Sequence, residues 1–119
     1  MTPNKIIEQI DNMAPNTFRE EDKLQWISEL DGMVQRTVWQ LPHEETISYA
    51  YPQDMDRELL IPSPFDNVYA LYVKAMIDYH NGEFEKYNAS AQMFHTRFED
   101  YKKAYIRENM PKSAGYVRL

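Results

Sequence analysis

Aromatic and other apolar side chains recur at alternating spacings of three and four in the last third of the chain. The series contains Phe84, Tyr87, Ala91, Phe94, Phe98, Tyr101 and Tyr105. This spacing places its members on one side of an α-helix, along a seam like that of a coiled coil. We therefore predict a helix over residues 83–109, which would be about 40 Å long.

A helix of that length is longer than a compact domain of 119 residues is wide, because such a domain has a radius of gyration of about 13–14 Å. We therefore expect either that one end of the helix projects, or that the domain is elongated and completes its packing in an assembly. If the aromatic series were exposed, it would be able to stack on nucleobases. The nearby basic residues do not follow a matching groove, which favours core packing instead.

A second helical pattern comes just before the first. Its apolar members are Val68, Leu71, Tyr72, Ala75, Met76 and Tyr79. Ser63 and Pro64 suit the N-cap and the first position of a helix, so we predict that this helix begins there. Asn81 and Gly82 tolerate the left-handed conformation that often ends helices. The two helices are then joined by a short turn and form an antiparallel hairpin.

Two more helices are expected near the start of the chain. We predict one helix over Pro3–Met13, capped by Thr2. A second helix follows, with Thr17 as its cap and acidic residues in its first turn, and runs to about Leu41. Gly32 lies inside this helix, where we expect it to permit a close approach of another helix at a cost of about 1 kcal/mol relative to alanine.

Residues 42–62 carry neither a sustained helical period nor a clean strand alternation, although residues 47–51 would suit a short extended segment. A loop of this length is uncommon in a small domain unless it is functional or disordered, and this one is too apolar for a plain linker. Two interpretations stay open: the loop packs on its own domain, or it binds a partner. The candidate residues for a partner interface are Tyr49, Tyr51, Leu59, Leu60 and Ile61.

These patterns predict an all-α fold. We expect a helical bundle of about four helices, with a long antiparallel C-terminal hairpin and a long irregular loop between the second and third helices. Residues 1–109 are expected to form a single helical domain, and residues 110–119 an extended tail.

The net charge of −6 is unevenly distributed. Residues 1–96 are acidic, whereas residues 97–119 carry six Lys/Arg against three Asp/Glu. An acidic body disfavours nonspecific binding to nucleic acid, while a basic tail can still approach phosphate or an acidic protein surface. The tail has two interpretations, a frayed end or a peptide that docks on a neighbour. Its candidate interface residues are Lys112, Tyr116, Val117, Arg118 and Leu119.

The sequence lacks cysteine and lacks any segment typical of a signal peptide or a membrane span. The chain has no cysteine, which excludes a disulfide framework and thiolate chemistry and fits a reducing compartment. Its first residues lack the basic start and apolar core of a signal peptide, and no later run approaches the roughly 20 apolar residues that span a bilayer. We therefore expect a soluble protein that does not enter a membrane.

No motif predicts catalysis. Glycine-rich phosphate loops, nucleophile elbows and His-Glu-x-x-His helices are absent from the sequence. His95 and Glu99 have a spacing that would place two ligands on one metal ion, but no further ligand is indicated. Glu29 and Asp31 would be able to supply an acid and a base, yet no pocket that would shift their pKa values is indicated. We therefore expect no enzyme activity, no cofactor and no metal.

Three stretches together resemble a known family. They are "FREEDKLQWISELDGMV", "ELLIPSPFDNVYALYVKAMIDYHNGEFEKYN" and the aromatic helix that follows. Their order and content resemble small helical head-to-tail connector proteins, also called adaptor or head-completion proteins, of tailed bacteriophages and prophages. The resemblance covers about residues 4–105, and the loop at 42–58 and the basic tail lie outside the shared motifs.

The resemblance implies a structural virion protein at the head-tail junction, present in the host cytoplasm before assembly. It implies a homo-oligomeric ring that docks to the portal protein and offers a surface to a tail-completion or stopper protein. DNA would pass through the ring without sequence-specific binding, and a monomer before assembly is compatible with this role. From the basic charge and terminal apolar residues of the tail, we expect Lys112–Leu119 to dock on the portal or on an adjacent subunit. The alternative is a small helical interaction or regulatory module from a phage or mobile element, which binds one protein partner without forming a ring.

Overall fold

The computed structural model describes residues 1–109 and is helical, with no strand in that range. Its α-helices are α1 (Pro3–Met13), α2 (Glu20–Met33), α3 (Val68–His80) and α4 (Phe84–Asn109). A π-helical segment, η1 (Val34–Val38), continues α2, and a short 3₁₀ turn, η2 (His43–Glu45), follows it. The predicted all-α bundle with a long C-terminal hairpin and a long irregular loop is therefore confirmed.

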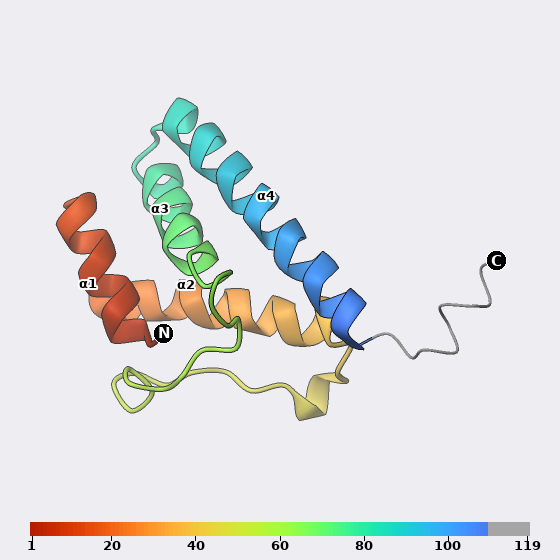
Figure 1. Cartoon of the computed structure of the whole chain (residues 1–119). Helices are drawn as coiled ribbons and strands as arrows, with labels where there is room; N and C mark the ends of the chain where they lie inside the picture. The colour runs from red at the N-terminus through yellow and green to blue at the C-terminus, as the bar shows by residue number, and fades with distance from the viewer. Residues whose placement is uncertain (110–119) are drawn as a thin grey trace.

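The other helices stand on one side of α2. In Figure 1, α2 lies across one end of the molecule, α1, α3 and α4 rise from it, and the loop after η2 runs beneath it. α3 and α4 run antiparallel and are joined by a tight turn at the far end. The molecule measures 52 × 33 × 23 Å and has a Cα radius of gyration of 15.7 Å. The expectation of an elongated molecule is confirmed.

The core forms where α1, α2 and α3 meet, and α3 is the central helix because it also packs on α4. The side chains that are almost completely buried include Ile6, Leu24, Ile27, Leu30, Val34, Ile61, Val68, Tyr69 and Val73. The apolar stripe predicted for α3 was incomplete, because it missed Tyr69, Val73 and Ile77. A helix with neighbours on both sides buries more than one stripe.

The predicted start of the second helix was wrong, whereas that of the first is confirmed. α1 begins at Pro3, and the hydroxyl of Thr2 accepts a hydrogen bond from the Lys5 backbone N–H (3.3 Å). α2 begins at Glu20 instead of near Thr17. The Asp22 carboxylate accepts a hydrogen bond from the Arg19 backbone N–H (3.4 Å), which closes the first turn.

The regular part of α2 is also shorter than the prediction, which extended it to Leu41. It ends at Met33 and becomes π-helical up to Val38. The Thr37 hydroxyl donates to the Met33 carbonyl (2.7 Å), and such side-chain bonds compete with the regular helical pattern. The Trp39 N–H bonds to the Val34 carbonyl (2.9 Å), one residue further back than in an α-helix.

Gly32 does not mark a close contact between helices. A Cβ atom built at this position has no heavy atom within 4 Å. The expectation of a close helix approach at Gly32 is therefore wrong, because the helices that pack on α2 contact its other sides.

α3 begins at Val68, so the predicted start at Ser63 and Pro64 is wrong. Residues 62–67 form consecutive turns, in which the Phe65 N–H donates to the Pro62 carbonyl (2.9 Å) and the Val68 N–H to the Phe65 carbonyl (3.2 Å). The Ser63–Pro64 peptide bond is cis. This proline lies in a turn before the helix and does not occupy the first helical position.

The predicted end of the third helix at Asn81 and Gly82 is confirmed. Gly82 has a φ of 73°, which favours glycine. The Gly82 N–H donates to the Tyr79 carbonyl (3.0 Å) and the Glu83 N–H to the Asp78 carbonyl (2.9 Å). These two bonds form a Schellman motif, which ends α3 and starts the turn into α4.

The predicted long C-terminal helix is confirmed, but only part of its aromatic seam is buried. Phe98 and Tyr101 are 6% and 4% exposed, whereas Phe84 is 59% exposed. The hairpin turn joins the end of α3 to the start of α4, so the shorter α3 lies along the first half of α4. Tyr101 lies beyond the length of α3 and is covered by Phe65 and Trp39, which come from other parts of the chain.

Candidate interaction surfaces

Three buried polar side chains on α2 and η1 face the long loop. Ser28, Asp31 and Gln35 follow one another at spacings of three and four, which places them on one side of the helix. The Ser28 hydroxyl accepts a hydrogen bond from the Tyr49 N–H (2.9 Å). The Gln35 side chain donates to the Ile47 carbonyl (3.0 Å) and accepts from the Ile47 N–H (2.8 Å). These hydrogen bonds pair backbone N–H and C=O groups of the loop, which would destabilise the fold if they were buried without a partner.

Asp31 lies at the centre of this polar side and is 0% exposed. Its carboxylate accepts hydrogen bonds from the hydroxyls of Tyr49 and Tyr69 and from the Leu60 N–H (3.2 Å). The Tyr69 hydroxyl oxygen accepts in turn from the Ile61 N–H (2.8 Å). α2, α3 and two parts of the loop therefore meet at one carboxyl group.

The charge state of this group is set by opposing effects. Burial raises the pKa of the Asp31 carboxyl above its ordinary value because desolvation disfavours the charged form, and the hydrogen bonds from Tyr49, Tyr69 and Leu60 oppose that rise. Burial and the Asp31 charge also raise the pKa of both tyrosine hydroxyls, so both stay protonated donors. Because no part of Asp31 is exposed, its carboxyl group anchors the loop and does not meet a substrate.

The sequence suggested Asp31 only as half of an acidic pair and missed its anchoring role. A signal was present: Ser28, Asp31 and Gln35 occupy the same side of the helix as Leu24 and Ile27. Polar residues at such positions are buried with their neighbours and need partners there. The aromatic partners Tyr49 and Tyr69 come from distant parts of the chain, and no local pattern pairs them with Asp31.

Much of the apolar part of residues 42–62 packs on the loop's own domain. Tyr49, Leu59 and Ile61 are 7%, 6% and 1% exposed, so these three proposed interface residues belong to the core and offer almost no surface to a partner. Leu60 is half-buried and Tyr51 is 41% exposed, and these two remain candidates. The candidates Lys112, Tyr116, Val117, Arg118 and Leu119 lie outside the described residues.

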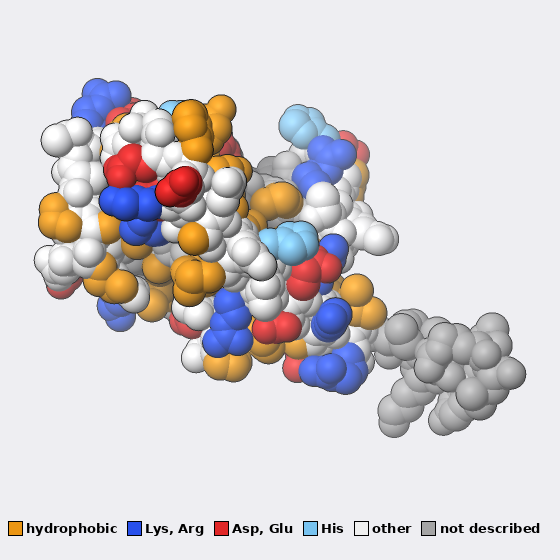
Figure 2. Space-filling view, turned by 90° about the horizontal axis from the view of Figure 1, so that it is seen from above, with side chains coloured by type: hydrophobic (Ala, Val, Ile, Leu, Met, Phe, Trp, Pro, Cys, Tyr) orange, Lys and Arg blue, Asp and Glu red, His pale blue; other side chains and the backbone are white. Residues whose placement is uncertain are grey.

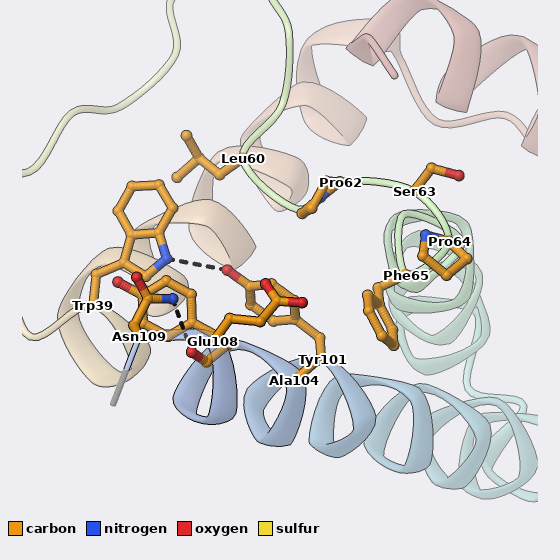
Figure 3. A pocket seen from close by; sticks show the side chains of 11 residues that line it. Trp39, Leu60, Pro62, Ser63, Pro64, Phe65, Tyr101, Ala104, Glu108 and Asn109 are labelled. Carbon is orange, nitrogen blue, oxygen red and sulfur yellow. Dashed lines mark hydrogen bonds between the residues drawn. The ribbon is translucent and has the colours of Figure 1, made fainter. Parts of the chain in front are cut away.

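A groove runs between Trp39, the turns at residues 60–65 and the last turns of α4 (Figure 3). Its volume is about 390 Å³. The Trp39 Nε1–H donates to the Tyr101 hydroxyl (3.0 Å) in its wall. We call this the Trp39 groove; its lining residues on α4 are Tyr101, Ala104, Tyr105, Glu108 and Asn109.

The far end of the α3–α4 hairpin exposes aromatic rings. Tyr79 and Phe84 are 50% and 59% exposed, and their ring centroids lie 6.1 Å apart. The Tyr79 ring also contacts that of Tyr87 at 5.4 Å. We call these three residues the hairpin tip. Figure 2, seen from this end, shows hydrophobic side chains lying among charged side chains of both signs.

His80 and His43 make local contacts. The His80 ring stacks on Trp26, with ring centroids 5.4 Å apart, and a ring nitrogen of His43 lies 3.3 Å from the Arg36 guanidinium. In residues 1–109, no group of three or more His, Asp or Glu side chains is placed to hold a metal ion. Within the same range, no helix has both the length and the apolar character needed to cross a membrane.

Comparisons with protein-family models, curated proteins and solved structures find no match for this chain. The resemblance to head-to-tail connector proteins therefore rests on the three sequence stretches quoted above, and it stays a prediction. The Trp39 groove and the hairpin tip are the surfaces from which a function has to be inferred.

Proposed function

We propose that this chain is a structural assembly subunit, a head-to-tail connector protein of a tailed phage or prophage. In this role it forms a ring that docks to the portal protein and bridges to a tail-completion or stopper protein. The sequence resemblance suggests the family, and the elongated helical shape is compatible with a subunit that completes its packing in an assembly.

The hairpin tip is the observation that carries this proposal. Tyr79 and Phe84 belong to the last turn of α3 and the first turn of α4 and are 50% and 59% exposed. The turn that joins these helices lies at one end of the hairpin (Figure 1). Aromatic residues are enriched in protein interfaces and often supply much of the binding energy. A cluster of them at the end of a long hairpin suits contact with a neighbouring protein.

The charge distribution is also compatible with a ring around DNA. Of the 13 basic and 19 acidic residues, only Lys112 and Arg118 lie in residues 110–119, so residues 1–109 have 11 basic and 19 acidic residues and a net charge of −8. A protein surface with this net charge does not attract the phosphate backbone of DNA unless it carries local basic patches. DNA would therefore pass along it without adhering.

Solution mass by light scattering tests the proposal, first on the chain alone and then after mixing with the portal protein encoded in the same genome. We expect a ring-sized mass, either immediately or on mixing. A monomer that ignores the portal would contradict the connector role and favour the alternative, a solitary interaction or regulatory module.

A pair of variants tests the hairpin tip itself. Phe84→Asp should abolish association because it places a charge in the aromatic cluster, whereas the fold should survive because Phe84 is 59% exposed. Ile106→Asp is the matched control, since Ile106 lies near the other end of α4 and is 50% exposed. If Ile106→Asp abolishes association and Phe84→Asp does not, the hairpin tip is not the interface.

A further inference from the structure

We propose that the Trp39 groove is the docking site for the chain's own segment Tyr116–Leu119. The inference concerns the isolated chain and does not depend on the connector role. It rests on the chemistry of the groove, on the place where α4 ends, and on the composition of residues 110–119.

The groove offers apolar surface from both of its sides. The rings of Trp39 and Tyr105 are stacked with centroids 6.1 Å apart, and those of Phe65 and Tyr101 lie at the same separation. Figure 3 shows Leu60 across the opening from α4, with Trp39 and Phe65 toward opposite ends. The volume of about 390 Å³ lies in the range of about 300–1,000 Å³ that is usual for ligand sites. Such a space suits a few apolar side chains of an extended segment.

The groove wall also holds a hydrogen-bond donor. The Tyr101 hydroxyl oxygen accepts from Trp39 Nε1–H, and within residues 1–109 no acceptor lies in hydrogen-bonding range of its own proton. Burial raises the pKa of Tyr101, so the hydroxyl stays protonated. The backbone carbonyls of an extended segment are acceptors of the kind that this donor would bind.

The described end of α4 lies beside the groove, within reach of the segment. Asn109, the last described residue, lines the groove, and the stretch of α4 from Tyr101 to Asn109 is about 12 Å long. Residues 110–115, when extended, reach up to about 20 Å, so Tyr116 can reach any part of the groove. A tether this short gives an effective concentration in the millimolar range, which favours the chain's own segment over that of another molecule.

The composition of the segment matches the groove. Tyr116, Val117 and Leu119 supply aromatic and aliphatic side chains for the apolar walls, and Arg118 stands between them. The Glu108 carboxylate is exposed at the groove rim and offers Arg118 an opposite charge. Exposed ion pairs contribute little, so we assign most of the binding to the apolar side chains.

NMR spectroscopy of the full chain tests the inference. The chain has two tryptophans, and a Trp26→Phe variant identifies which indole signal belongs to Trp39. We expect Val117→Asp to shift the Trp39 indole signal and the Leu60 amide signal, because a buried charge would release the segment from the groove. Ser113→Asp, which adds the same charge to the same tail outside the docking segment, should leave both signals in place. The amide of Gln9 on α1 serves as a distant reference.

Two results would overturn the inference. If Val117→Asp leaves the Trp39 and Leu60 signals unchanged while circular dichroism shows the same helix content, the segment does not occupy the groove. If the two signals in the unmodified chain move on dilution, the segment comes from another copy and the assignment to the chain's own tail is wrong. Shifts caused by Val117→Asp, together with signals that do not depend on concentration, would support it.

Discussion

At the scale of single residues, Asp31 shows how a polar group specifies the path of a loop. A buried carboxyl group needs donors, and it receives them from Tyr49, Tyr69 and Leu60. The helix position of Asp31 was predictable from the sequence. Its partners were not, because Tyr49 lies in a loop without periodicity and Tyr69 falls outside the apolar stripe predicted for its helix.

The pH dependence of stability tests the balance of forces on Asp31. The pKa of its carboxyl is raised in the folded state, so the folded protein binds the proton more tightly than the unfolded chain does. In the unfolded chain, aspartates titrate at about pH 3.9. The resulting stabilisation is complete below that pH and is lost as pH rises through the folded-state pKa. We therefore expect the free energy of unfolding of the wild type, relative to Asp31→Asn, to fall as pH rises from about 4.

Urea unfolding of both proteins at a series of pH values, from about 4 to about 7, measures this difference. Asp31→Asn is a suitable reference because it keeps the shape of the side chain and cannot titrate. If the difference instead rises with pH, the three hydrogen bonds outweigh burial and the folded-state pKa is lowered.

At the scale of elements, the interiors of the helices were predictable, whereas the start and the regular end of α2 and the start of α3 were not. The 3.6-residue period of the apolar positions identified each helix, because burial of one side imposes it. Helix ends depend on local hydrogen bonds such as the one at the start of α2, where the Arg19 backbone N–H donates to the Asp22 carboxylate. At Ser63 and Pro64 the local sequence suits a helix cap, yet these residues lie in turns before α3.

Alanine substitutions at two glycines test how backbone conformation affects the stability of the fold. A Cβ atom at either Gly32 or Gly82 meets nothing within 4 Å, but only Gly82 has a positive φ, of 73°. Gly32→Ala should therefore stabilise the protein by about 0.5–1 kcal/mol, because alanine has the higher helix propensity and the less flexible unfolded chain. Gly82→Ala should destabilise it by about 1–2 kcal/mol because of the left-handed backbone.

Thermal and urea unfolding of the two variants measure both effects. Because neither substitution creates a clash, opposite signs would assign the difference to the backbone conformation alone. Destabilisation by Gly32→Ala would mean that the transition from α2 to η1 requires a glycine at this position.

At the scale of the whole molecule, α4 divides into a part that belongs to the core and a part that projects from it. Within the aromatic seam, Phe98 and Tyr101 are 6% and 4% exposed, while Phe84 is 59% exposed and Tyr87 is half-buried. The sequence predicted the length of the helix and the elongated shape. It did not predict which half would be covered, because the seam has the same composition along its whole length and the covering segments come from elsewhere in the chain.

This division predicts a gradient of local stability along α4. Segments with few buried contacts open more readily than core segments, so amides near Tyr87 should exchange with solvent at least about tenfold faster than those near Tyr101, a difference of about 1.4 kcal/mol. Native-state hydrogen exchange resolved by residue measures the ratio. Equal protection along α4 would mean that the hairpin opens together with the core.

If the hairpin tip is the interface, mixing with the portal protein should slow exchange near Tyr87 and leave the amides near Tyr101 unchanged, because only the projecting half gains a covering surface.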